Sequence, residues 1–140
     1  MCTVLNAHSA DINTVCFANR ENSNIVFSGS DDASIKVWDR RTFGNNGYPE
    51  GYLIGHREGV SCVSSKGDGV HLISNSKDQT LKLWDLRTMK TVQEYNEFSN
   101  RYNVASGFDY RWEDYPLRNY TKKLRSDSSS KTFRGHSVLK

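Results

Sequence analysis

The sequence predicts an all-β fold made of four-stranded sheets that repeat along the chain, as in the blades of a β-propeller. The first observation is an internal repeat, because residues 28–41 align without a gap on residues 74–87, at an offset of 46 residues. The second is a small residue followed by His upstream of each copy, at Ala7-His8 and Gly55-His56. A Gly-His…Trp-Asp unit that recurs at about 40–45 residues is typical of a WD-repeat blade.

The number of repeats indicates part of a larger propeller. A propeller closes with about 4–8 blades, whereas this chain of 140 residues holds two copies. Because a repeat unit needs neighbours to bury its faces, we expect a fragment or a short isoform. The expected organisation is the last strand of a preceding blade at 1–8, carried by Thr3-Val4-Leu5, then blade one at 9–55, blade two at 56–134, and the start of the next blade at 135–140, with a third pair at Gly135-His136.

Blade one shows four short apolar runs separated by turn-forming residues. The segments between the runs are rich in Gly, Pro, Asn and Asp, which favour turns. The fourth run leads directly into the Gly-His pair that opens blade two. Short apolar runs bounded by such turns are consistent with buried strands. The four runs lie at 12–17, 25–27, 35–38 and 52–54.

Blade two repeats this pattern for three strands, at 60–63, 72–73 and 81–84. The Asp-Gly pair between the first two favours a tight hairpin. Two segments compete for the fourth strand. Distance from Trp84 favours residues 91–95, whereas adjacency to the next Gly-His favours residues 131–133. We prefer the second, because the fourth strand of blade one also abuts Gly-His, and this choice makes about 88–130 an insertion.

The insertion holds half of the aromatic side chains of the chain. Disordered segments are poor in aromatic residues, so two interpretations remain open. The aromatics anchor the insertion on the flank of the propeller, or Tyr110, Arg111 and Trp112 form part of a partner-binding surface, since Tyr, Trp and Arg are common hot-spot residues. The eight aromatics are Tyr95, Phe98, Tyr102, Phe108, Tyr110, Trp112, Tyr115 and Tyr120.

Composition predicts a soluble protein of a reducing compartment. The three cysteines are odd in number and widely spaced, which argues against a disulfide framework. No stretch approaches the ~18 apolar residues of a membrane span, and the sequence shows no signal peptide. We therefore expect a cytoplasmic or nuclear location, or both, and no contact with a membrane.

Each copy carries a His, a Ser, an Asp and a Trp at equivalent positions. A Ser-His-Asp catalytic triad is the less favoured interpretation, because an enzyme needs one site and this set recurs in every blade. A chain of hydrogen bonds from indole to hydroxyl to imidazole to carboxylate satisfies buried polar groups instead. It also resembles the structural tetrad of WD-repeat propellers, and we expect no catalytic residue, metal site or cofactor. The sets are His8, Ser28, Asp32 and Trp38 in blade one, and His56, Ser74, Asp78 and Trp84 in blade two.

An arginine stands two residues after each Trp-Asp, at Arg41 and Arg87. Repetition by blade places both arginines on the same rim, one blade apart. An exposed guanidinium group makes bidentate contacts to carboxylates or carbonyls of a partner. The alternative is local pairing of each arginine with the preceding strand-end carboxylate, Asp39 or Asp85.

Two consecutive Trp-Asp-x-Arg units resemble the box found in WD-repeat substrate receptors of cullin-four RING ubiquitin ligases. In that family, the arginine helps to dock the receptor on the damaged-DNA-binding adaptor subunit, which implies such a role for Arg41 and Arg87. We expect Asp39 and Asp85 to belong to the same adaptor-binding site. The blade segments and the stretch Asp109-Tyr110-Arg111-Trp112 also resemble one receptor subgroup, called WD-repeat protein twenty-three in animals, with the LEC-type WD proteins of plants. The resemblance covers most of the chain, and Ala7 departs from the usual Gly.

The resemblance implies a non-catalytic scaffold that acts in protein ubiquitination and proteasomal degradation. Its partners would be the adaptor with cullin-four and an unknown protein substrate, which is held near the ubiquitin carrier so that proximity promotes transfer. The alternative is a general WD-repeat scaffold outside the ubiquitin system, with RNA contact through the basic segment 118–134. Acidic residues and a Ser-rich break weaken the RNA alternative, so nucleic acid is not the expected partner.

Overall fold

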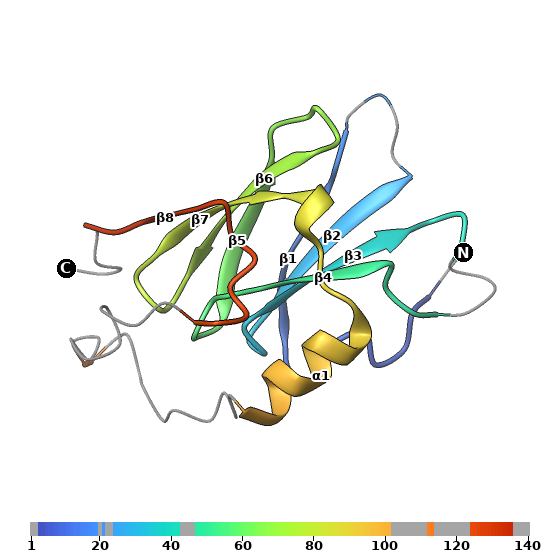
Figure 1. Ribbon diagram of the computed structural model, residues 1–140. Coiled ribbons are helices and arrows are strands. Elements are labelled where there is room, and N and C mark those ends of the chain that lie inside the picture. Colours follow the sequence, from blue (N-terminus) through green and yellow to red (C-terminus); the bar gives the residue numbers. More distant parts are fainter. Residues whose placement is uncertain are drawn as a thin grey trace.

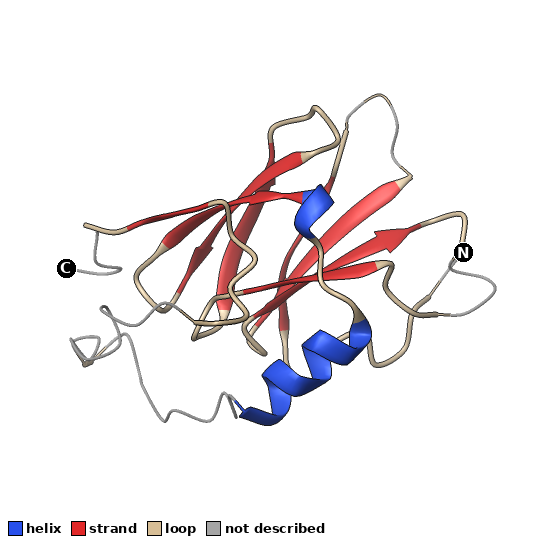
Figure 2. Ribbon diagram, viewed as in Figure 1, coloured by secondary structure: helices blue, strands red, loops and turns tan. Residues whose placement is uncertain are grey.

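Two four-stranded antiparallel sheets make up the described part of the chain, with strand orders β1-β2-β3-β4 and β5-β6-β7-β8. The computed structural model describes residues 3–19, 21, 24–42, 47–101, 112–113 and 124–135. Strands dominate these ranges, and one helix and one helical turn lie between β7 and β8 (Figures 1 and 2). This architecture confirms the predicted all-β class and the two blades of an incomplete propeller.

The first sheet follows the predicted order, and its second, third and fourth strands are longer than the apolar runs alone indicated. The β2 ladder continues through Ser28 to Ser30, because the small side chains at its end are buried rather than exposed. The four strands are β1 (Ile12–Phe17), β2 (Ile25–Ser30), β3 (Ser34–Asp39) and β4 (Gly51–Ile54).

The second sheet takes its fourth strand from the distant segment. β8 pairs with β7 antiparallel, with Leu81 opposite Phe133 and Leu83 opposite Lys131. The competing segment 91–95 instead lies at the start of helix α1 (Val92–Arg101). The strands are β5 (Val60–Ser65), β6 (His71–Ser76), β7 (Leu81–Asp85) and β8 (Lys131–Phe133), and the turn η1 (Leu86–Thr88) follows β7.

Helix α1 was not predicted, and local chemistry explains it. The Glu94 carboxylate accepts from the backbone N–H of Thr91 at 2.9 Å, while the Thr91 hydroxyl oxygen lies 3.4 Å from the Glu94 backbone nitrogen. This reciprocal arrangement is a capping box, which satisfies backbone donors at a helix N-terminus. Lys90 adds an ion pair to Glu94 at 2.9 Å. The sequence Thr-Val-Gln-Glu therefore begins a helix where a strand was considered.

Residues 3–5 form no strand in this structure, and their place in the last strand of a preceding blade stays a prediction. Thr3 and Val4 lack regular structure, and Leu5 begins a turn with its side chain 82% exposed. A strand needs a hydrogen-bonded neighbour, and the two sheets contain only the strands β1 to β8 among the described residues. His136 of the third Gly-His pair lies outside the described residues.

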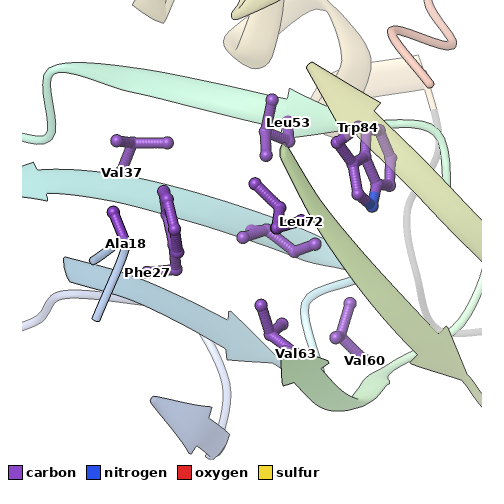
Figure 3. Packing of buried hydrophobic residues seen from close by; sticks show 9 residues of the cluster. Ala18, Phe27, Val37, Leu53, Val60, Val63, Leu72 and Trp84 are labelled. Atoms are coloured by element: carbon purple, nitrogen blue, oxygen red, sulfur yellow. The ribbon is translucent and has the colours of Figure 1, made fainter. Parts of the chain in front are cut away.

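The core lies between the two sheets. Side chains from β2, β3 and β4 meet side chains from β5, β6 and β7 (Figure 3). Gly29 permits this close approach, because a Cβ there would meet the side chains of Thr14 and Val60 at 2.8 Å. Across the described ranges, no helix combines the length and the apolar character needed to cross a membrane. The buried cluster is Ala18, Phe27, Ile35, Val37, Leu53, Val60, Val63, Leu72 and Trp84.

Candidate functional site

Both predicted tetrads form continuous hydrogen-bonded chains. In blade two, the Trp84 indole N–H donates to Ser74 Oγ at 2.7 Å, and Ser74 Oγ lies 2.7 Å from His56 Nε2. His56 Nδ1 lies 3.0 Å from Asp78 Oδ2. Because an ionised carboxylate only accepts, Nδ1 carries the proton and Nε2 accepts from the serine hydroxyl. Thr80 completes the network with a 2.6 Å bond from its hydroxyl to Asp78 Oδ1.

The same chain recurs in blade one with nearly the same dimensions. The distance is 2.8 Å from Trp38 Nε1 to Ser28 Oγ, 2.7 Å from Ser28 Oγ to His8 Nε2, and 2.8 Å from His8 Nδ1 to Asp32 Oδ2. Ser34 takes the place of Thr80, also at 2.6 Å from the carboxylate.

Burial favours a structural role for these networks. Ser28 and Ser74 are 5% and 2% exposed, so a substrate cannot reach either hydroxyl. A satisfied polar network rigidifies the core around it, whereas one with an unpaired member is costly. Within the described ranges, no group of three or more His, Cys, Asp or Glu side chains is placed to hold a metal ion.

The tetrads predict a loss of stability in acid. Burial alone would raise the pKa of Asp78 and of Asp32, but hydrogen bonds from the adjacent His and from the Thr80 or Ser34 hydroxyl outweigh it and lower both to about 2, from an ordinary value of 3.8. Each ionised carboxylate therefore contributes stability above about pH 4 that is lost as the pH falls through its folded pKa, about 2 kcal/mol per group. We expect the melting temperature of the intact protein to fall steeply between about pH 4 and pH 2.

An Asp78→Asn variant provides the check on this acid response. Its melting temperature should be lower at pH 7 and should depend less on pH between 5 and 2 than that of the wild type. If the melting temperatures of the two proteins fall in parallel as the pH is lowered, Asp78 does not contribute to the acid sensitivity.

Each rim arginine forms a bidentate pair with the carboxylate that ends its third strand. Arg41 Nε lies 3.0 Å from Asp39 Oδ1, and Nη2 of the same guanidinium contacts the other carboxylate oxygen. Arg87 repeats this with Asp85, at 2.9 Å through Nε and 2.6 Å through Nη2. The local pairing considered for these arginines is therefore present in both blades.

Local pairing leaves the arginines accessible to a partner. Their side chains are 70% and 75% exposed, while the Asp39 and Asp85 side chains beneath them are 9% and 15% exposed. The hydrogen bonds from Arg87 hold the pKa of Asp85 at about 2, and those from Arg41 also lower the pKa of Asp39. Two of the five N–H donors of each guanidinium are used in this way. The carboxylate fixes the side chain, and three donors remain for an external acceptor.

A comparison with known families decides the class of the protein. The family described as WD domain, G-beta repeat matches residues 1–39 and 47–85. The chain belongs to this WD40 repeat family. Each matched stretch ends on the Trp-Asp pair at the end of β3 or β7, directly before the loop that carries the rim arginine.

The WD40 chain is also similar to longer curated proteins. It is 48% identical to the LEC14B homolog of Prunus armeniaca, over 96% of this chain and 27% of that protein. The LEC14B protein of Lithospermum erythrorhizon is 47% identical, over 96% and 28%. The DDB1- and CUL4-associated factor 11 homolog of Caenorhabditis elegans is 42% identical, over 98% and 24%. The chain thus spans about a quarter of these relatives, and their names confirm the predicted resemblance to this receptor subgroup.

Two aromatic side chains of the insertion pack against blade one. The Tyr95 ring stacks on the Tyr52 ring with centroids 4.3 Å apart, and Phe98 is buried in a cluster with Ile54 and Leu124. Trp112, one of the predicted partner-binding residues, is 85% exposed. The other two, at positions 110 and 111, lie outside the described residues.

The burial of two lysines was not predicted from the sequence. Lys36 and Lys82 occupy equivalent positions in β3 and β7, and are 8% and 3% exposed. Lys36 Nζ donates to the Ala7 carbonyl at 2.8 Å and lies 5.0 Å from the Tyr95 ring centre. Lys82 Nζ forms an ion pair with Asp127 at 2.7 Å. Both lysines stand at the same repeat position, between apolar neighbours of a central strand. This pattern in the sequence could have predicted that they are buried.

Proposed function

We propose that this WD40 chain is part of a non-catalytic substrate receptor that docks on DDB1 of a cullin-four ubiquitin ligase through Arg41 and Arg87. The observation that carries the proposal is the pair of exposed guanidinium groups, held in the same bidentate geometry at the same position of two adjacent blades. The name of the Caenorhabditis elegans relative, DDB1- and CUL4-associated factor 11 homolog, supports the choice of partner.

The strand-end carboxylates prepare the arginines for binding. Asp39 and Asp85 hold each guanidinium in one plane, so less side-chain freedom is lost when a partner binds. The remaining N–H donors suit carboxylate or carbonyl acceptors, which an arginine recognises more specifically than a lysine does. A rim with two such groups one blade apart favours a partner that offers two acceptors at a matching distance.

The receptor contributes binding rather than bond chemistry. The adaptor would engage the arginine rim, and a substrate held by another surface would be brought near the ubiquitin carrier, so that proximity raises the rate. The exposure of Trp112 supports the insertion as a candidate for that second surface.

Co-precipitation from cells tests the docking role. The intact protein should retain DDB1, and an Arg41→Ala/Arg87→Ala variant should lose it while melting at the same temperature. Arg40→Ala, which removes one positive charge beside Arg41, serves as the matched control and should retain DDB1. Equal capture by wild type and double variant, or capture by neither, would favour a scaffold outside the ubiquitin system.

A further inference from the structure

The loop that carries Arg87 is attached to the neighbouring blade. Two residues after η1, Lys90 and Tyr52 of β4 exchange both backbone hydrogen bonds, at 2.8 and 3.0 Å. Met89 lies against Gly51, where a Cβ would come within 2.8 Å of the Met89 sulfur. In Figure 1 the chain leaves β7, passes β4 and continues into α1. The backbone that follows Arg87 therefore lies along the outer edge of blade one, although Arg87 belongs to blade two.

The end of the insertion returns to the same edge. We call residues 124–130 the strap. The Ser128 backbone N–H donates to the Ile54 carbonyl at 2.9 Å, and the Ile54 N–H donates to Ser128 Oγ at 3.2 Å. The ion pair between Lys82 and Asp127, both 4% exposed, fixes the strap to blade two. Gly55 makes room for it, because a Cβ there would lie 2.3 Å from an Asp127 carboxylate oxygen.

One side chain joins the strap to the Arg87 loop. The Thr88 hydroxyl lies 2.8 Å from the Asp85 carbonyl and 3.1 Å from the Ser128 carbonyl of the strap. Thr42 is its repeat equivalent in blade one, and its hydroxyl contacts the Asp39 carbonyl and the Glu50 carboxylate, each at 2.9 Å. The two loops thus close on their own strands in the same way, but the loop of blade two also depends on the insertion.

We propose that the strap positions Arg87 for docking, with Thr88 as the positioning residue that transmits its contact. This inference rests on the proposed docking function and adds an asymmetry to it. The location of Arg87 relative to blade one depends on the insertion, whereas the location of Arg41 is set within its own blade. Any event that loosens the strap, including a partner that binds the insertion, weakens docking at Arg87 first.

Hydrogen exchange of the intact protein tests the strap without the adaptor. Thr88→Val keeps the shape of the side chain and removes its hydroxyl. We expect the backbone amides of residues 87–90 to exchange several times faster in this variant, and to be unchanged in the matched Thr42→Val variant. Gly51→Val, which displaces Met89, tests the separate attachment of the same loop to β4 and should also speed the exchange. Unchanged exchange in Thr88→Val would overturn the inference, whatever the result for Gly51→Val.

A double-mutant cycle with purified DDB1 separates positioning from general stability. Thr88→Val should weaken affinity roughly five-fold, the usual effect of one hydrogen bond. The loss should disappear in an Arg87→Ala background and persist in an Arg41→Ala background, because contacts that act through one group are not additive. Equal losses in both backgrounds would overturn the inference, since the strap would then act on the fold as a whole.

The DDB1 affinities of Arg87→Ala and Thr88→Val distinguish an error in the docking proposal from an error in the role of the strap. If Arg87→Ala leaves DDB1 affinity unchanged, the docking proposal falls, and the role of the strap in docking falls with it. If Arg87→Ala weakens affinity but Thr88→Val changes neither exchange nor affinity, the docking proposal stands and only the role of the strap is overturned.

Discussion

Replacing Trp84 with Ala is expected to lower the free energy of unfolding by about 3–5 kcal/mol, the usual cost of truncating a buried Trp. The side chain is fully buried between the two sheets and lies in the cluster that joins them. It also donates its indole N–H to Ser74 at the head of the blade-two tetrad. The substitution therefore leaves a cavity and removes a donor from a buried network.

Two further variants separate these contributions. Trp84→Phe keeps most of the volume and loses the donor, so a smaller loss of about 1–2 kcal/mol is expected. Tyr48→Ala removes an aromatic ring that is 76% exposed, and should change stability by less than about 0.5 kcal/mol. Urea unfolding of the intact proteins, followed by circular dichroism, measures all three. A loss below about 1 kcal/mol for Trp84→Ala would contradict the structural role of the tetrad.

Replacing Asp127 with Ala is expected to cost a similar amount, about 3–5 kcal/mol. The substitution leaves the Lys82 ammonium group in a buried site without its carboxylate partner, and the two side chains are each only 4% exposed. Thr132 remains as a neutral acceptor at 2.8 Å, which does not balance the charge. The strap should also detach from Gly55, because the Asp127 side chain fills the space beside that glycine.

A double substitution provides the control for this pair. Lys82→Met/Asp127→Leu removes both charges, and apolar replacements of a buried ion pair are often neutral. We expect the double variant to be more stable than Asp127→Ala in the same urea titration. If Asp127→Ala unfolds at the wild-type urea concentration, the ion pair does not hold the strap to blade two.

Repetition made the two blades predictable. The gapless match of residues 28–41 to 74–87 places the same donors and acceptors in both copies, so the tetrads follow from the sequence alone. The short apolar runs then gave the strands between Ile12 and Asp85, with boundaries extended by buried serines such as Ser30 and Ser76.

Features outside the repeat were harder to predict for a physical reason. The strap contacts β4 through Ile54 and Ser128, 74 residues apart in sequence, and no local pattern encodes such a contact. Helix α1 had a local signal in the capping box of Thr91 and Glu94, which the β pattern of the flanking blades obscured. For β8, the distance from Trp84 favoured residues 91–95, whereas adjacency to Gly135 favoured residues 131–133. Adjacency predicted the observed strand.

The arginines show how two interpretations of one side chain are compatible. From the sequence, each arginine was predicted either to pair with the preceding aspartate or to bind a partner. The two roles looked exclusive because each guanidinium group was given a single acceptor. The structure places Asp39 and Asp85 on one edge of each group and leaves the side chains exposed. Repeat equivalence alone could not show that Arg87 lies on a loop held by the insertion, whereas Arg41 does not.

The most direct test of the docking proposal is the equilibrium affinity of the purified intact protein for purified DDB1. Removing charged groups that are hydrogen-bonded in an interface commonly costs about 2–5 kcal/mol. The Arg41→Ala/Arg87→Ala variant should therefore bind at least about thirty-fold more weakly, while Arg40→Ala should bind within about two-fold of wild type. An unchanged affinity for the double variant, in a protein that melts normally, would contradict docking through the arginine rim.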